Sequence, residues 1–348
     1  MPKKRFTKDD ISAFLTRTQM NPRGGCQCKL AGIELEDMLS RVSGNTVQNA
    51  ALLKSIDHVE DCAILRQVPN VLLVTTDLIP IVGVDLVAAG RIAALHSMSD
   101  IYACGGIAKW ALVTLIIDST WPKRFADAVL TGIFSECHQS GVEVVGGQTI
   151  IGSEGMAGLS VIGVPRGERV LRKEGGKVGD LLLLSKPLGV GLVLRAYKLG
   201  IVGDFDLQTA MAVMTASNEA ASVLAIRANV NASTDITGYG LLGHLSEMLP
   251  HDMGAILYVG RIPMLPSISS IPPALSQTEW IRNNYEYAVQ KHQFVGKTDM
   301  SQLAPLLDPQ TNGGLLISVS PEAADALIDG GFTVIGQVTG SNEFSLRG

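Results

Sequence analysis

Two cysteines and a lysine stand close together near the N-terminus, at Cys26, Cys28 and Lys29, directly after two glycines. A cysteine thiolate is a nucleophile and a soft ligand, and nearby positive charge lowers its pKa. The segment therefore predicts a reactive cysteine on a hinged arm, beside a lysine that can contact phosphate. The alternative is a pair of incidental exposed cysteines. Structural zinc is not favoured, because no second Cys/His pair follows at a suitable spacing.

Four aspartates, Asp61, Asp77, Asp100 and Asp235, each adjoin an apolar strand or helix in the sequence. An unpaired carboxylate is costly to bury, so each needs a compensating partner. Mg²⁺ takes carboxylate ligands and completes its shell with water and substrate phosphates. Taken singly, each aspartate is more typical of a helix cap or a turn. Taken together, they predict a site for a metal-bound nucleotide.

Two glycine-containing segments, 146–149 and 235–243, offer backbone N–H groups that can approach a phosphate. The same glycines are also explained by conformation alone. Neither segment matches a P-loop or a dinucleotide-binding fingerprint, which makes those two classes of protein less favoured.

The composition bounds the class of protein. With 348 residues, 46% hydrophobic and 18% charged, the chain is expected to form two medium-sized domains. No apolar run reaches the roughly 20 residues of a membrane span, and no secretory signal is recognised, so a cytoplasmic location is expected. A net charge of −5 does not favour nucleic acid as a partner. The basic arm, residues 1–29, is either a polyphosphate contact or a solvated terminus.

The five cysteines are an odd number without framework spacing, which predicts free thiols in a reducing compartment. Cys62, Cys104 and Cys137 lie in apolar patterns and are expected in the core. His96 and His244 fall on predicted helices, and we expect packed or capping histidines rather than metal ligands.

Hydrophobic periodicity predicts the order β-β-α-β-α-β-β in the first half of the chain. This order favours an α+β layer, with helices on one sheet face, over a doubly wound parallel sheet. The predicted elements there are strands at 62–68, 71–76, 111–117, 142–145 and 156–164, with helices at 85–104 and 123–140. In the second half we expect strands at 181–184, 315–319 and 333–338, one long helical region at 207–228, a helix ending by 250, and long surface excursions with a helical piece at 261–295.

Together these motifs resemble those of the selenophosphate synthetases, also called selenide, water dikinases, in the same order over nearly the whole chain. The matching segments are Gly25-Cys26-Gln27-Cys28-Lys29, Glu60-Asp61-Cys62-Ala63, Thr75-Thr76-Asp77, 90–101, Gly146-Gly147, 235–245 and Asp308-Pro309-Gln310-Thr311. The resemblance implies an α+β, two-domain fold like that of aminoimidazole ribonucleotide synthetase. Its parts would be a mobile arm at 1–45, an ATP-binding and dimerisation domain at 46–167, and an α/β C-terminal domain at 168–348.

The resemblance also implies a reaction, in which ATP, selenide and water give selenophosphate, AMP and orthophosphate, with Mg²⁺ as cofactor. The product would supply activated selenium for selenocysteine and selenouridine. The implied partners are a second copy of the chain, in a homodimer with the nucleotide near its interface, and a transient selenium-donor protein. The implied catalytic residues are Cys26 and Lys29, and the implied metal ligands are Asp61, Asp100 and Asp235. The implied ATP contacts are Lys29, His58, Val59, Glu60, Asp77, Asp100, Gly147, Gln148 and Thr149.

Four positions depart from the commonest family pattern: Gln27, Glu60, Gln148 and Asn312. None removes an essential functional group, so they bear on rate and affinity more than on the type of reaction. Two alternatives stay open. One is another ATP-dependent enzyme of the same superfamily, such as a ring-closing ligase or a thiamine-phosphate kinase. The other is a non-catalytic selenium or metal carrier, which would have no use for the aspartates.

Overall fold

In the computed structural model, each half of the chain forms one β-sheet with its own helices. The structure describes residues 33–34, 52–54, 61–67, 70–82, 85–276, 278–295 and 300–348. The predicted arm, with Cys26 and Lys29, lies outside the described residues apart from 33–34. The predicted ATP contacts His58, Val59 and Glu60 also lie outside them.

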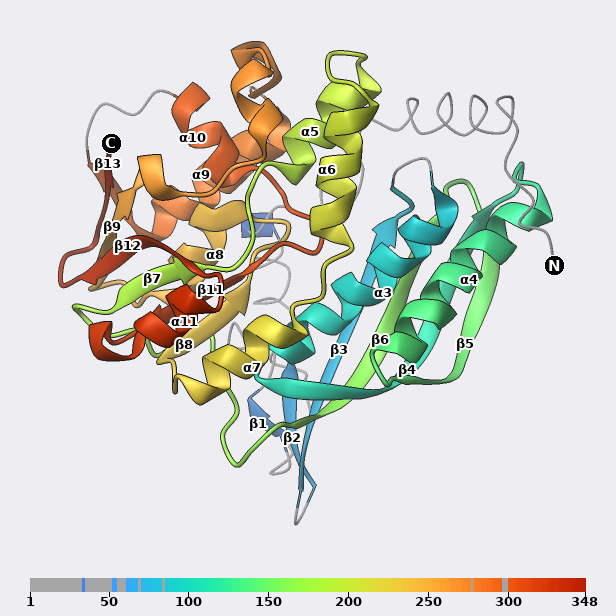
Figure 1. The fold of residues 1–348 in the computed structure, drawn as a ribbon, viewed down its shortest axis with the longest axis horizontal. Coiled ribbons are helices and arrows are strands. Elements are labelled where there is room, and N and C mark those ends of the chain that lie inside the picture. Colours follow the sequence, from blue (N-terminus) through green and yellow to red (C-terminus); the bar gives the residue numbers. More distant parts are fainter. Residues whose placement is uncertain are drawn as a thin grey trace.

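After a short additional strand at Leu52–Lys54, the first half of the chain has the element order that the periodicity predicts. Its elements are β1 (Leu52–Lys54), β2 (Ala63–Gln67), β3 (Asn70–Pro80), α3 (Leu86–Ala103), β4 (Gly106–Asp118), α4 (Lys123–Gln139), β5 (Glu143–Gly152) and β6 (Met156–Pro165). The strands form one sheet in the order β1-β2-β3-β6-β4-β5, in which only the β4–β5 pairing is parallel. Helices α3 and α4 lie over one face of this sheet (Figure 1). The expected α+β layer is confirmed.

Helix α3 lies at the centre of the molecule. It packs on β3 and β6 on one side and meets α6, α7 and β8 of the second half on the other (Figure 1). Fourteen of its 18 residues are buried, so polar as well as apolar side chains of this helix lie inside the protein. Asp85 caps its N-terminus, and Gly105, with φ of +73°, follows its last turn. Capping and backbone contacts therefore fix both ends of the helix that carries Asp100.

Two glycines set the distance between α3 and α4. A Cβ atom on Gly90 would lie 2.0 Å from the carbonyl oxygen of Val129, and one on Gly132 would lie 2.0 Å from that of Val87. Real side chains never approach backbone so closely, so only glycine permits this crossing.

The face of the first sheet opposite the helices carries exposed apolar side chains. Along β4 the side chains of Ala111, Val113 and Leu115 are buried under the helices, so the alternating residues point the other way. We call this the outer sheet face and define it by Leu78, Trp110, Leu112 and Ile150, which are 39%, 40%, 44% and 46% exposed.

Strand β5 is longer than the sequence predicts. We expect the strand to stop before Gly146, but it continues through 146–149 to Gly152 as the edge of the sheet. Gly147 has a φ of +155°, and a Cβ atom there would lie 2.1 Å from the carbonyl oxygen of Val113. Close pairing with β4 thus requires this glycine, and the expectation that the strand ends at Val145 is wrong.

The second half is built on a seven-stranded sheet, in the order β10-β13-β9-β12-β7-β11-β8. The pairings β10–β13 and β13–β9 are parallel, and the others are antiparallel. Its strands are β7 (Leu181–Leu184), β8 (Ala232–Asp235), β9 (Gly254–Tyr258), β10 (Gln293–Val295), β11 (Leu315–Val319), β12 (Thr333–Thr339) and β13 (Glu343–Arg347). Its helices are α5 (Val190–Lys198), α6 (Asp204–Met214), α7 (Glu219–Arg227), α8 (Gly240–Met248), α9 (Glu279–Lys291), α10 (Met300–Leu307) and α11 (Asp325–Asp329), with short 3-10 turns at Val259–Arg261, Pro266–Ser270, Pro273–Ser276 and Pro321–Ala323.

Three expectations for this half are wrong. The single long helix at 207–228 is two helices, because the chain turns at 215–218 and Asn218 points inward with 1% of its surface exposed. Strand β13 extends the sheet beyond the last predicted strand. The segment 261–295 contains the expected helical piece, α9, but it is not only a surface excursion, because Ile281 and Tyr287 of this helix are buried.

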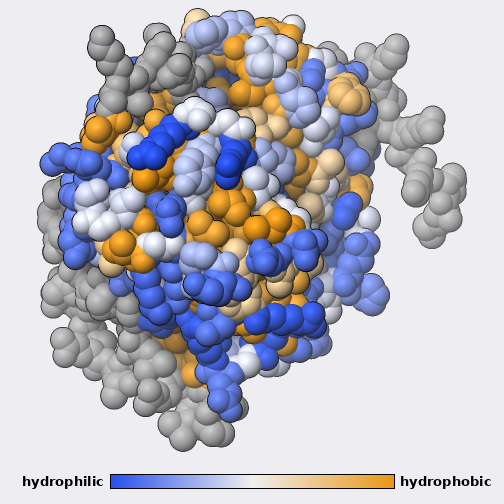
Figure 2. All heavy atoms as spheres, turned by 60° about the vertical axis from the view of Figure 1, so that its left-hand side comes forward, coloured by the Kyte–Doolittle hydropathy of each residue, from blue (hydrophilic) through white to orange (hydrophobic). Residues whose placement is uncertain are grey.

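Among the described residues, no helix is long and apolar enough to cross a membrane. On the face shown in Figure 2, hydrophobic residues form several patches separated by hydrophilic ones.

Candidate metal and nucleotide site

Three of the four predicted aspartates meet in space. Asp61, Asp100 and Asp235 each present a carboxylate oxygen, and these three atoms lie within 4.8 Å of one another. Asp61 lies two residues before β2, Asp100 lies in the last turn of α3, and Asp235 ends β8. We call this group the aspartate triad. Because it draws on both halves of the chain, it exists only when the two halves are packed together.

A hydroxyl group holds one oxygen of each carboxylate in the triad. Thr75 donates to Oδ2 of Asp100 at 2.5 Å. Ser99 donates to Oδ2 of Asp235 at 2.5 Å, and Thr234 donates to Oδ1 of Asp61 at 3.0 Å. Such partners orient ligands and raise their affinity for a metal. The second oxygen of each carboxylate can then serve a cation.

A buried lysine adjoins the triad. Lys173, which is 5% exposed, lies 2.7 Å from Oδ1 of Asp61 and 3.1 Å from Oε2 of Glu247. Burial alone would lower the pKa of Lys173, but the charges of these two carboxylates raise it well above its usual value. Burial also acts to raise the pKa of Glu247, yet Lys173 and His244 lower it on balance. The lysine is therefore a fixed positive charge that offsets part of the charge of the triad.

The carboxylates of the triad repel one another when no cation is present. Burial raises the pKa of Asp61 to about 6, with Lys173 opposing and Asp235 adding to the rise. Burial, followed by the charges of Asp77, Asp235 and Asp61, raises the pKa of Asp100 well above its usual value. Clustered like charges of this kind favour a bound cation. An all-oxygen donor set fits a hard divalent ion such as Mg²⁺.

Asp77 and two histidines surround the triad without joining it. Oδ1 of Asp77 lies 3.8 Å from Nε2 of His96, whose Nδ1 accepts the backbone N–H of Asn312 at 3.2 Å. His244 accepts the N–H of Thr237 through Nε2. Both histidines are buried on helices, as the sequence predicts, and Cys62, Cys104 and Cys137 are buried free thiols.

The predicted ATP contacts at 147–149 do not reach the triad within one chain. One row of paired residues runs across strands β3, β6, β4 and β5 and consists of Asp77, Leu159, Val113 and Gly147. Three strand spacings separate the ends of this row, which amounts to about 14 Å. Gly147, Gln148 and Thr149 thus lie at the sheet edge, apart from Asp77.

The segment 308–312 caps a helix. Oε1 of Gln310 accepts the N–H groups of Gly189 and Val190, and Oδ2 of Asp308 accepts that of Leu192, all at the N-terminus of α5. These acceptors pair backbone donors that a buried helix terminus leaves unsatisfied. This segment, one of the motifs that carry the family resemblance, therefore has a structural role in capping α5.

We expect Asp308→Asn to flatten the dependence of stability on pH. Burial raises the pKa of Asp308 to about 7, against the hydrogen bonds from Leu192 and Gln310. The folded state therefore holds a proton that the unfolded state releases, and this contribution is present at low pH and lost as pH rises through 7. Between pH 5 and 8 the wild type should lose about 2–3 kcal/mol relative to the variant, measured by urea unfolding. Parallel stability curves would contradict this.

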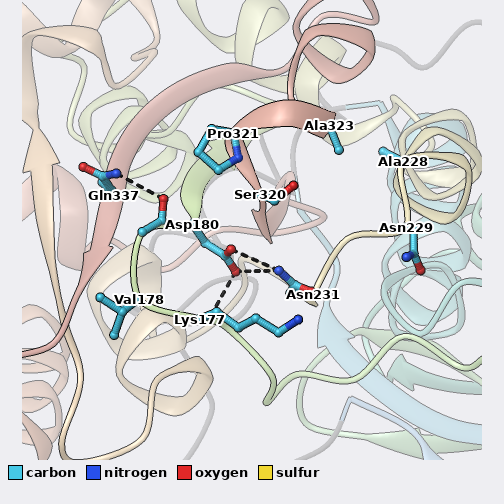
Figure 3. Close-up of a pocket in the computed structure, with 11 residues that line it drawn as sticks. Lys177, Val178, Asp180, Ala228, Asn229, Asn231, Ser320, Pro321, Ala323 and Gln337 are labelled. Carbon is cyan, nitrogen blue, oxygen red and sulfur yellow. Dashed lines mark hydrogen bonds between the residues drawn. The ribbon is translucent and has the colours of Figure 1, made fainter.

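A pocket of about 800 Å³ lies in the second half of the chain. Its lining includes Lys177, Asp180, Asn231 and Gln337 (Figure 3). The Asp180 carboxylate accepts from Asn231, from the Lys177 backbone and from Ser318. These polar groups hold the turn together, and none of the lining residues is a predicted site residue.

Sequence reasoning missed the groups that surround the triad: Thr75, Ser99, Lys173, Asn218 and Thr234. A partial signal exists, because Ser99 and Thr234 directly precede Asp100 and Asp235, and Thr75 shares a strand face with Asp77. Lys173 gives no signal, since a lysine in a polar loop is typical of an exposed position.

Comparison with known proteins places this geometry in a class. Family models described as AIR synthase related protein, N-terminal domain and C-terminal domain, match residues 59–164 and 177–348. Thiamine monophosphate kinase from Aquifex aeolicus has the same fold, with a TM-score of 0.66 at 19% identity, over 92% of this chain and 97% of that one. The E. coli hydrogenase maturation protein HypE gives 0.61 at 17% identity, over 90% and 94%. The chain has the two-domain fold of the AIR synthase related proteins.

Curated relatives narrow the class further. Proteins named selenide, water dikinase are 32% identical in Treponema denticola, over 96% of both chains, and 34% identical in Pelobacter propionicus, over 92% of this chain and 91% of that one. The relative in Carboxydothermus hydrogenoformans is 32% identical over 85% and 83%. The chain belongs to the selenide, water dikinase family of enzymes, as its motifs predict.

Proposed function

We propose that this protein makes selenophosphate from selenide, ATP and water, releasing AMP and orthophosphate, with Mg²⁺ held by the aspartate triad. The observation that carries this proposal is the meeting of three aspartates from two domains in a chain of the selenide, water dikinase family. A cation bound there would neutralise charge on the transferred phosphoryl group.

The chain's own residues divide the remaining work. Asp77 lies close enough to Asp100 for its charge to raise the Asp100 pKa, so it is placed to contact the nucleotide held at the triad. His58, Val59 and Glu60 precede Asp61 in sequence and are proposed as further ATP contacts. We assign phosphate contact to Lys29 and the handling of selenium to Cys26. Closure of the arm would exclude water and limit wasteful hydrolysis of ATP.

A homodimer would cover the outer sheet face. An exposed patch of large apolar side chains marks an interaction surface, and here the patch lies on the sheet of the N-terminal domain. We propose that a second copy of the chain covers this patch, in a dimer formed by the N-terminal domains. Since 147–149 lies at the edge of this sheet, about 14 Å from Asp77, we propose that it contacts ATP bound by the partner.

The dimer predicts the behaviour of Leu112→Arg. Placing a charge at the middle of the outer sheet face should convert the dimer to a monomer, because the guanidinium would be buried without a partner. Light scattering after gel filtration measures this. Phe134→Arg is the matched control, because Phe134 is exposed on α4, on the opposite side of the sheet, and the variant should stay dimeric. A monomeric wild type would exclude the proposed dimer.

The cytoplasm is the proposed compartment, because the described cysteines are free thiols, which persist under reducing conditions. Selenide would reach the site there, free or from a transient donor protein.

The nucleotide product tests the proposed function. With ATP, Mg²⁺ and selenide, the protein should form AMP at a rate that depends on selenide. Formation of ADP, with or without selenide, would instead indicate another ATP-dependent enzyme of the superfamily. Stoichiometric selenium binding without nucleotide turnover would indicate a carrier.

A further inference from the structure

In two places the residue before a triad aspartate holds an aspartate of the other domain. Ser99 precedes Asp100 in the N-terminal domain and donates to Asp235 of the C-terminal domain. Thr234 precedes Asp235 and donates to Asp61 of the N-terminal domain. Each domain therefore supplies a hydroxyl that holds a carboxylate of the other domain, and the positions of these carboxylates depend on how the domains dock.

The direction of the Ser99 hydroxyl is itself fixed. The side-chain amide of Asn218 donates to Oγ of Ser99 at 2.9 Å and to the carbonyl oxygen of Gly313 at 2.8 Å. A serine hydroxyl has one proton, so Oγ accepts from Asn218 and gives its proton to Asp235. Ser99, Asn218 and Asp235 are 0%, 1% and 2% exposed, so bulk water does not compete for these bonds.

We propose that Ser99 is a positioning residue for the cation site, and that Asn218 acts through it. Ser99 holds Oδ2 of Asp235, a carboxylate that presents an oxygen within 4.8 Å of those of Asp61 and Asp100. Ser99 thus acts through the ligand Asp235, and Asn218 acts through Ser99. The inference rests on the cation role proposed above for the triad. Loss of such an outer hydrogen bond lowers metal affinity by about 10- to 100-fold.

Calorimetric titration of the full-length, nucleotide-free protein with MnCl₂ tests this directly. Ser99→Ala should raise the Kd for Mn²⁺ by about 10- to 100-fold. Asn218→Ala should raise it by a smaller factor. The double variant should bind no more weakly than Ser99→Ala alone, because Asn218 works through the serine.

Ser97→Ala is the matched control. Ser97 lies one half-turn earlier on α3, is 1% exposed, and accepts the N–H of Leu159 at 3.0 Å, without contact to the triad. It should lower the melting temperature and leave the Kd for Mn²⁺ within about twofold, since outer-shell effects are local to the ligand.

The outcomes separate the two proposals. A wild type that binds Mn²⁺ while Ser99→Ala binds it equally well overturns the role of Ser99 alone. Equal weakening in Ser97→Ala and Ser99→Ala also overturns it, since the loss would then be general. A wild type without Mn²⁺ binding overturns the cation role and this inference together. If Ser99→Ala does not fold, an unchanged Kd in Asn218→Ala overturns the inference.

Discussion

Asp235→Asn should abolish divalent-cation binding and reduce selenide-dependent AMP formation by about 1000-fold or more, since a metal ligand contributes several kcal/mol to stabilising the transferred charge. Asparagine has the shape of aspartate and can still accept the Ser99 hydroxyl, so the local structure is kept. What is lost is one of three carboxylate ligands, whose oxygens lie within 4.8 Å of one another.

The same substitution should not destabilise the metal-free protein. The charge of Asp235 contributes to the raised pKa values of both Asp61 and Asp100, so its removal relieves repulsion. We therefore expect an equal or higher melting temperature without metal, together with loss of the increase that Mn²⁺ gives the wild type. Scanning calorimetry with and without MnCl₂ measures both quantities.

Asp85→Asn is the control for this change. Asp85 caps α3 by accepting from the backbone of Val87 and Ala88, which asparagine can also do, and it lies outside the triad. It should retain full activity. Retained Mn²⁺ binding and turnover in Asp235→Asn would show that the triad does not hold the cation.

Cys26→Ser should lower selenide-dependent AMP formation by more than about 1000-fold while leaving the affinity for ATP unchanged. Serine has nearly the same size, but its hydroxyl is neither a thiolate nor a soft atom, so it cannot take the place of sulfur in handling selenium. Rapid-quench measurement of AMP and calorimetric titration with a non-hydrolysable ATP analogue separate the two effects.

Gln27→Gly is the matched control on the same arm, because it changes the residue between the two cysteines without removing a thiol and should stay active. Full activity in Cys26→Ser would remove the cysteine from the reaction, and loss of ATP affinity would indicate a role in nucleotide binding.

Elements with local signals were predictable. Helix α3 follows from its apolar period and Gly105–Gly106, and α8 follows from the glycine-containing segment 235–243 that leads into it. The extension of β5 through Gly147 could not be predicted, because a glycine in the sequence usually indicates a turn. Here glycine is required because the backbone of β4 lies too close for a side chain. The break before α7 depends on contacts of Asn218 with residues about 95 and 119 positions away in sequence.

The site divides in the same way. The aspartates could be chosen from the sequence because a carboxylate next to an apolar element needs a partner. The hydrogen bonds from Ser99 and Thr234 to these aspartates could not be predicted. Each hydroxyl donates to an aspartate of the other domain, and such a pair forms only when the two domains dock.

Phosphorus NMR of the wild-type protein with ATP, Mg²⁺ and selenide tests the proposed reaction most directly. We expect a new resonance from a phosphorus–selenium bond, growing together with AMP and orthophosphate in equal amounts. A spectrum that shows ADP and orthophosphate, with no phosphorus–selenium species, would contradict selenophosphate synthesis.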